Sequence, residues 1–313
     1  MKGFFSNNSA LFQLGILFYF VLIGLLLNSA VGYVIINIPR LLSDGEPTGA
    51  INNSFYALHT IQFFSCILVF ILPSICTAYL CNKKPVEFLL FKRSVDVRIL
   101  LLSIVMMLLI SPIIGIAAEL NSKIQIPEFM PSVAEFMNRA ESHAAKITEK
   151  LLSEKGFMPL VTNIFIIGIM AGISEELIFR GALLSTIRKK IKNPHVAIWI
   201  VAIIFSIIHF QFSGFIPRII LGAFLGYLLL WTRNIWVPIF VHFLNNLTVI
   251  IGYKTGFYQI APDSAVLTST NTGINKLYNS ELYNSVPIAI IAIIIGVIIF
   301  VLLYFCAKKM KSL

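Results

Sequence analysis

The strongest constraint on the fold of this chain is a series of apolar stretches, each about 20 residues long and almost free of charge. A helix needs about 20 apolar residues to cross the ~30 Å hydrocarbon core of a bilayer. Unpaired backbone groups are too costly in lipid for open, non-helical spans. The composition agrees, because 58% of the 313 residues are hydrophobic and 12% are charged, against about 25% charged in a soluble domain. These features predict an all-α, polytopic membrane helix bundle.

The pattern predicts about eight transmembrane helices, which form a single membrane domain over residues 1–313. The predicted spans are residues 10–37, 56–81, 98–119, 160–184, 194–212, 215–232, 235–252 and 286–307. The connection over 253–285 is rich in Asn, Ser and Thr, which is typical of an exposed, irregular loop.

Lysine and arginine residues gather at the ends of the predicted spans. The net charge is +10, but these positions favour contact with lipid head groups over nucleic acid. With eight spans, the basic clusters that follow the second, fourth, sixth and eighth helices all lie on one side, which the positive-inside rule assigns to the cytoplasm. We therefore expect a multi-pass protein of the plasma membrane with both termini cytoplasmic. Its surroundings are the lipid bilayer, and no nucleic-acid partner is expected.

Ionisable residues inside the predicted spans are few, and they gather in neighbouring helices. A titratable side chain in lipid is costly and usually faces a partner, a cavity or a pathway. The fourth predicted helix carries Glu175, Glu176 and Arg180, the fifth carries His209 and the seventh carries His242. This distribution indicates a common polar interior rather than random scatter.

The spacing within the fourth helix separates the two carboxylates. Glu176 and Arg180 stand at i and i+4, so they share a helix face and can form an internal ion pair. Glu175 is rotated by about 100° from Glu176 along an ideal helix. We therefore expect Glu175 to face a different neighbour and to be the carboxylate with a functional role.

The same rule places Phe205 with His209 on one helix face, and His242 with Asn246 on another. Structural explanations compete with functional ones at these positions. An intramembrane histidine can be a hydrogen-bonded contact between helices, and Asn246, or the neighbouring Asn245, can serve as polar glue.

These residue types together suit the hydrolysis of an amide bond. A carboxylate can act as general base and, with a histidine, deprotonate a water, while a second histidine and an amide can hold the oxyanion of the intermediate. The alternative is a Zn2+ ion bound by Glu175, His209 and His242 with an open position for water. The chain has no HExxH motif, so the usual short zinc signal is lacking.

At these residues the sequence resembles the CPBP family, which comprises CAAX prenyl proteases and bacteriocin-processing or immunity proteins. The three family motifs EExxxR, FxxxH and HxxxN/D are intact and in order within residues 160–250, a segment that we interpret as the motif-bearing catalytic core. The motif positions are Glu175, Glu176, Arg180, Phe205, His209, His242 and Asn246.

The resemblance implies an eight-helix membrane endopeptidase similar to the type II CAAX prenyl endopeptidase. By that analogy Glu175 and His209 activate the water, and His242 and Asn246 form the oxyanion hole. The implied supporting residues are Glu176, Arg180 and Phe205. The family was long classed as metalloprotease, and we favour a glutamate-type mechanism without a metal cofactor, with Zn2+ as the alternative.

The expected substrate is a membrane-embedded or lipid-modified peptide or protein. One alternative is a non-catalytic immunity or scaffold protein with the same fold, which a degraded motif would favour. A less favoured alternative is a proton-coupled transporter, which inverted repeats of broken helices would favour.

The predicted spans place two site residues at different depths in the membrane. His209 would lie about 22 Å along its helix from the cytoplasmic end, and Glu175 about 14 Å along its own. Either the fifth helix is strongly tilted or its start is misplaced.

Overall fold

A computed structural model describes residues 2–42, 55–91, 94–124, 126–127, 129–255, 258–260 and 267–269. The described chain is built almost entirely from helices, which confirms the predicted all-α membrane bundle. Six of its helices are long and apolar enough to cross a membrane: Ala10–Asn37, Phe55–Cys81, Val97–Ser122, Phe157–Lys190, Phe215–Thr232 and Trp236–Lys254. The protein is therefore a multi-pass membrane protein. The eighth predicted span, residues 286–307, lies outside the described residues.

The chain divides into two compact units. The first unit comprises Met1–Arg93, Lys150–Ala197 and His242–Ile250, and the second comprises Ser94–Glu149, Ile198–Val241 and Ile251–Leu313. The motif-bearing segment 160–250 thus contributes to both units.

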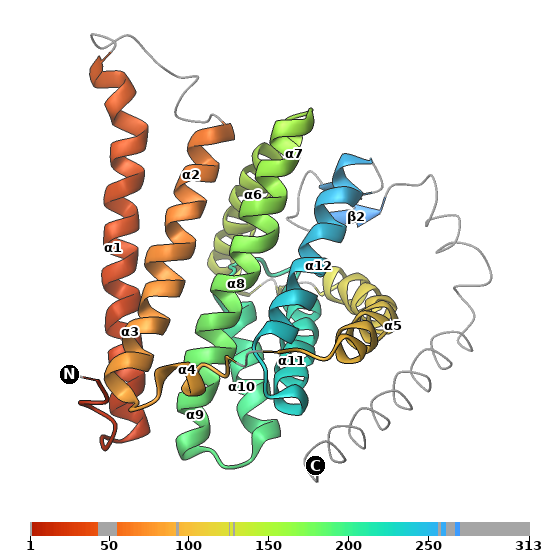
Figure 1. The fold of residues 1–313 in the computed structure, drawn as a ribbon. Coiled ribbons are helices and arrows are strands. Elements are labelled where there is room, and N and C mark those ends of the chain that lie inside the picture. Colours follow the sequence, from red (N-terminus) through yellow and green to blue (C-terminus); the bar gives the residue numbers. More distant parts are fainter. Residues whose placement is uncertain are drawn as a thin grey trace. The chain divides into compact units, whose positions relative to one another are not determined.

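In the first unit, α1 (Ala10–Leu42) packs along a second long helix over residues 55–81 (Figure 1). That helix is made of α2 (Phe55–Ser65), a π-helical segment η1 (Cys66–Ile71) and α3 (Leu72–Cys81), and the short α4 (Pro85–Phe88) follows it. Gly24 in α1 faces the π-helical segment so closely that an added Cβ atom would lie 2.1 Å from the carbonyl oxygen of Leu68. The absence of a side chain at Gly24 is therefore what allows this backbone approach.

We expect Gly24→Ala to destabilise the first unit, because the methyl group would collide with backbone rather than with a movable side chain. Overpacking of this kind costs about 1–3 kcal/mol. Gly15→Ala on the same helix is the matched control, since its added Cβ would meet nothing within 4 Å. Thermal unfolding of both variants in detergent should show a lower midpoint for Gly24→Ala alone, and equal midpoints would contradict the close-packing account.

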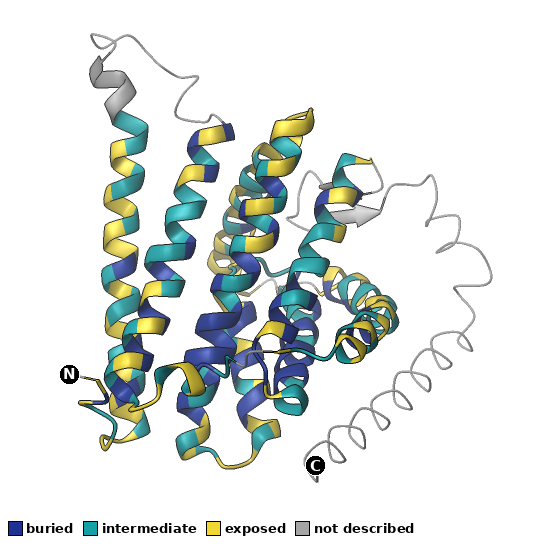
Figure 2. Ribbon diagram, viewed as in Figure 1, coloured by how far each residue is buried: buried dark blue, intermediate teal, exposed yellow. Residues whose placement is uncertain are grey.

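The other long helix of this unit runs over residues 157–190 and alternates between α- and π-helical turns. Its segments are α7 (Phe157–Asn163), η2 (Ile164–Met170), α8 (Ala171–Glu176), η3 (Leu177–Leu183) and α9 (Leu184–Lys190). α8 contacts η1, and η3 contacts α3. Figure 2 shows that α8 and η3 are largely buried. π-helical turns often occur at functional sites. Glu175 and Glu176 lie in α8, between the π-helical segments η2 and η3.

One end of the first unit carries both the N-terminal segment and the basic cluster that follows the 157–190 helix. The ammonium of Lys189 donates to Oε1 of Gln13 at 2.6 Å, and the backbone N–H of Gly3 donates to the carbonyl of Tyr79 at 2.8 Å. The N-terminal segment, the end of α3 and the basic cluster therefore lie on the same side, as the charge pattern predicted. The assignment of that side to the cytoplasm stays a prediction, and the C-terminus lies outside the described residues.

In the second unit, α5 (Val97–Ser122) packs against α11 (Phe215–Thr232). Asp96 caps α5 by accepting a hydrogen bond from the backbone N–H of Arg98 at 2.9 Å, and its bonds with Arg98 hold the pKa of the Asp96 carboxyl below its ordinary value. Most of α6 (Pro131–Ser153) belongs to this unit, and α10 (Pro194–Ile207) and α12 (Trp236–Lys254) contribute to both units.

The fifth predicted span is wrong in length. α10 begins at Pro194, as predicted, but it ends at Ile207 instead of residue 212. Its 14 residues cover about 21 Å, which is less than the ~30 Å of a bilayer core. The start of the helix was thus placed correctly, and the error lies at its end. The apolar pattern continues past Ile207, but the backbone turns there, and side chains of α5 and α6 add hydrogen bonds to this turn.

The stretch predicted as an irregular loop, 253–285, contains a short antiparallel strand pair in its described part. β1 (Tyr258–Ile260) pairs with β2 (Leu267–Ser269), with Tyr258 opposite Ser269. The prediction was therefore wrong for these six residues. Strands this short show no recognisable periodic pattern in the sequence.

Candidate active site

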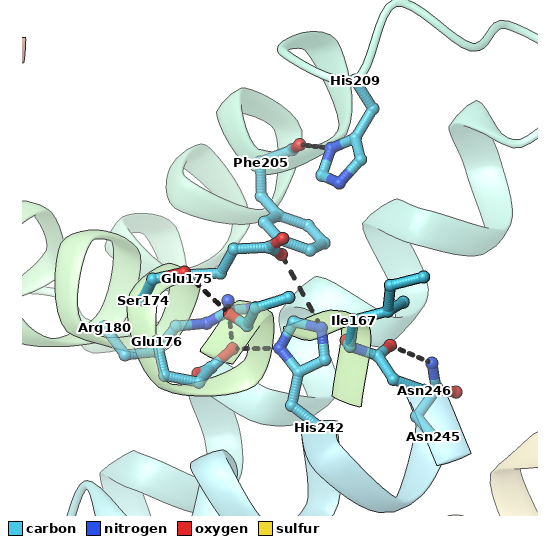
Figure 3. Close-up of polar contacts among 11 residues, drawn as sticks. Ile167, Ser174, Glu175, Glu176, Arg180, Phe205, His209, His242, Asn245 and Asn246 are labelled. Carbon is cyan, nitrogen blue, oxygen red and sulfur yellow. Dashed lines mark hydrogen bonds and ion pairs between the residues drawn. The ribbon is translucent and has the colours of Figure 1, made fainter. Parts of the chain in front are cut away.

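The 157–190 helix and α12 bring two carboxylates, an arginine and a histidine together in the first unit (Figure 3). Oε1 of Glu176 accepts a hydrogen bond from Nη1 of Arg180 at 2.7 Å and another from Nδ1 of His242 at 2.8 Å. The structure thus contains the predicted ion pair between Glu176 and Arg180. It also adds a histidine to the pair, so that one carboxylate oxygen serves two donors.

The four side chains differ in their access to the surface of the unit. The side chains of Glu176 and Arg180 are 0% exposed, that of His242 is 5% exposed and that of Glu175 is 18% exposed. Buried charges are tolerated only when they are paired and hydrogen-bonded. Glu176 meets this condition through Oε1, while its Oε2 is buried without a hydrogen-bond partner among the described residues. Glu175 is therefore the more exposed of the two carboxylates in the cluster.

His242 is oriented by Glu176. A carboxylate only accepts hydrogen bonds, so Nδ1 of the ring carries the proton shared with Glu176. The other ring nitrogen, Nε2, faces Glu175 at 3.7 Å from Oε2, a separation beyond an ordinary hydrogen bond. Sequence reasoning missed the link between Glu176 and His242 because the two residues are 66 positions apart, and helical spacing reveals only neighbours one turn away.

Asn246 lies one turn beyond His242 in α12 and contacts the same long helix. Its Nδ2 donates to the carbonyl oxygen of Ile167 at 3.0 Å. Ile167 belongs to η2, where the wider π-helical turn alters the usual backbone bonding. An amide nitrogen carries two protons, so this bond fixes the amide and uses one of them. Asn245 lies beside it, with Nδ2 at 3.5 Å from Oδ1 of Asn246.

His209 lies in the second unit, two residues beyond the end of α10. Its Nδ1 lies 2.7 Å from the carbonyl oxygen of Phe205, and its ring packs edge-to-face against the Phe205 ring with centroids 4.8 Å apart. Because a carbonyl only accepts, Nδ1 carries the proton, and Nε2 of the neutral ring is the basic nitrogen. Phe205 and His209 thus contact each other, although His209 lies beyond the end of the helix, and the supporting role of Phe205 stays a prediction.

The predicted convergence of His209 with Glu175, His242 and Asn246 stays a prediction, because His209 belongs to the other unit. The same holds for the alternative zinc set. Within the unit that holds Glu175 and His242, the described residues include no group of three His, Cys, Asp or Glu side chains arranged to bind a metal ion. Glu175 and His242 could supply two ligands, and a catalytic zinc would need a third from the protein.

The fold and this cluster define a class of protein: a multi-pass membrane protein with a carboxylate–histidine–amide site between its helices. Comparison with known families agrees with the motifs. Residues 157–248 match the model of the family described as type II CAAX prenyl endopeptidase Rce1-like, and the resemblance inferred from the motifs is thereby confirmed. Every predicted site residue lies within this matched segment.

Two relatives illustrate the similarity. The chain is 31% identical over 110 residues to the membrane-embedded CAAX protease MroQ of Staphylococcus aureus (strain USA300), an alignment covering 33% of this chain and 43% of MroQ. It is 26% identical over 102 residues to the uncharacterized protein YpbD of Bacillus subtilis (strain 168), covering 31% of this chain and 47% of YpbD. The alignments thus span less than half of either relative. No solved structure matches the chain significantly.

Proposed function

We propose that the protein is an intramembrane endopeptidase that cleaves a membrane-embedded or lipid-modified peptide or protein by a glutamate-type mechanism without a metal. The match to the Rce1-like family and the likeness to MroQ support the coarser statement, that it is a membrane protease. The observation that supports the glutamate-type mechanism is the difference in environment between the two carboxylates. Glu176 is fully buried and bonded, while Glu175 is accessible beside an oriented histidine.

In the proposed reaction, Glu175 is the general base. It removes a proton from a water while the oxygen of that water adds to the carbonyl carbon of the scissile bond. The tetrahedral intermediate then collapses, the C–N bond breaks, and the proton held by Glu175 passes to the leaving nitrogen. His209 is proposed to assist the activation of the water through Nε2, which its bond to Phe205 leaves as the basic nitrogen of the ring.

His242 and Asn246 are proposed to stabilise the oxyanion. His242 can donate from Nε2 only when both ring nitrogens carry protons. Two carboxylates and one guanidinium surround it, so a positively charged His242 brings the formal charge of Glu175, Glu176, Arg180 and His242 to zero. Asn246 contributes the second proton of the amide nitrogen that is anchored on Ile167. Donors held in place in this way can stabilise developing charge without reorganisation.

Membrane peptides should differ between cells that produce the wild-type protein and cells that produce Glu175→Ala. We expect mass spectrometry of the membrane fraction to find new peptide termini with the wild type only. The comparison works without a known substrate, since it surveys all termini. Identical sets of termini would contradict the proposal and favour a non-catalytic scaffold or immunity role.

The same cleavage, once located, tests the metal-free mechanism. A chelator should leave the cleavage by purified protein unchanged. Loss of cleavage that added Zn2+ restores would replace the proposed mechanism with the zinc alternative.

A further inference from the structure

A short loop over residues 208–214 joins α10 to α11 in the second unit, and His209 is its second residue. Phe210 follows with φ +50°, a left-handed conformation that is uncommon for residues other than glycine. Helices that end on a left-handed residue usually have glycine there. A strained conformation persists only when its surroundings hold it. The path of the chain after His209 therefore depends on contacts from outside the loop.

Asn121, near the end of α5, provides the first of these contacts. Its Nδ2 donates to the carbonyl of Phe212 at 2.7 Å, and its Oδ1 accepts from the backbone N–H of Ile216 at 3.0 Å. The side chain is buried. The amide donates to one backbone group and accepts from another, whereas a carboxylate lacks the donor and an apolar side chain lacks both.

Glu141, in α6, provides the second contact. Its Oε1 accepts from the backbone N–H of Ser213 at 2.7 Å and is also bonded to the Ser213 hydroxyl. Phe136 on the same helix packs edge-on to Phe212, with ring centroids 6.5 Å apart. Non-helical backbone inside a membrane protein needs partners for its polar groups. α5 and α6 supply partners here from side chains distant in sequence.

We infer that Asn121 and Glu141 are positioning residues that hold the loop after α10 and thereby orient His209. The inference rests on the proposed function, in which His209 helps to activate the water. Both residues lie outside the segment 157–248 that matches the family model, so the resemblance assigns them no role. The bond from His209 to Phe205 fixes the rotation of the ring, and the two side chains fix the backbone that carries it.

The kinetic test uses purified full-length protein and a peptide that the wild type cleaves. Asn121→Asp removes the donor to Phe212 with almost no change in shape, and Glu141→Ala removes the acceptor for Ser213. Displacing a catalytic group by about 1 Å can cost about 100-fold in rate, so we expect kcat to fall about 10- to 100-fold in both variants, with KM nearly unchanged. Glu141→Gln keeps an oxygen that can accept from Ser213 and should recover most of the kcat.

Hydrogen exchange supplies a readout that needs no cleavage. The amides of residues 208–216 should exchange faster in Asn121→Asp and in Glu141→Ala than in the wild type, because both variants lose bonds to this backbone. The matched controls are exposed neighbours on the same helices, Ser122→Ala and Glu135→Gln. Both controls should keep wild-type exchange and wild-type kcat.

The outcomes separate the inference from the function on which it rests. Unchanged exchange in both variants overturns the inference, and so does faster exchange with an unchanged kcat. Loss of activity in Glu141→Gln equal to that in Glu141→Ala also overturns it, since the conservative change preserves the acceptor. A wild-type protein that cleaves no membrane peptide overturns the proposed function, and the positioning role falls with it.

Discussion

Glu175→Gln should abolish cleavage while leaving the protein folded. The amide is nearly isosteric with the carboxylate and remains polar, so it removes the base and little else. A general base contributes about 10²- to 10⁴-fold to the rate, and we expect kcat to fall by that factor. Stability should change little, because the Glu175 side chain is partly exposed and its nearest ionisable partner, Nε2 of His242, is 3.7 Å away. The measurement is cleavage of a membrane peptide by the purified variant, alongside its thermal unfolding.

Glu87→Gln is the matched control, because it makes the same chemical change at a carboxylate of α4 that is 68% exposed and pairs at 3.0 Å with Lys84, the residue before the helix. Exposed pairs of this kind contribute little to stability, so this variant should match the wild type in activity and unfolding. Near wild-type cleavage by Glu175→Gln would show that the proposed mechanism is wrong.

The sequence predicts most of the fold because lipid imposes simple rules. Runs of about 20 apolar residues have few alternatives to a spanning helix, and the helices over 55–81 and 157–190 follow these runs closely. The end of α10 could not be predicted in this way. Residues 207–212 are still mostly apolar, but the chain turns there, where Asn121 and Glu141 bond to its backbone from other helices.

In the candidate site, too, the sequence predicts the contact within one helix but not the contacts between helices. The ion pair between Glu176 and Arg180 follows from i, i+4 spacing within one helix, and it is present. The bond from His242 to Glu176 joins two helices, and no local pattern indicates which of two adjacent carboxylates a distant histidine will meet. The bond from Asn246 to Ile167 is likewise hidden from the sequence, because its acceptor is a backbone carbonyl.

Glu176→Gln should destabilise the protein far more than Glu175→Gln does. Glu176 and Arg180 are fully buried, and the carboxylate also accepts from His242. Removing one partner of a buried ion pair costs about 3–5 kcal/mol, because the other charge is left without compensation. The midpoint of thermal unfolding in detergent should fall by on the order of 10 °C. A variant that is inactive but as stable as the wild type would instead show that the roles of Glu175 and Glu176 had been assigned the wrong way round.

A second variant separates the buried charge from the lost hydrogen bonds. Glu176→Gln combined with Arg180→Met removes both charges, and buried ion pairs can often be replaced by apolar groups of similar volume at little cost. We therefore expect the double variant to regain most of the lost unfolding midpoint. Its activity should stay low, because His242 loses the carboxylate that binds its Nδ1, and only Glu175 remains to support a charged ring. A double variant as unstable as Glu176→Gln alone would mean that Arg180 stabilises the helix through contacts other than its charge.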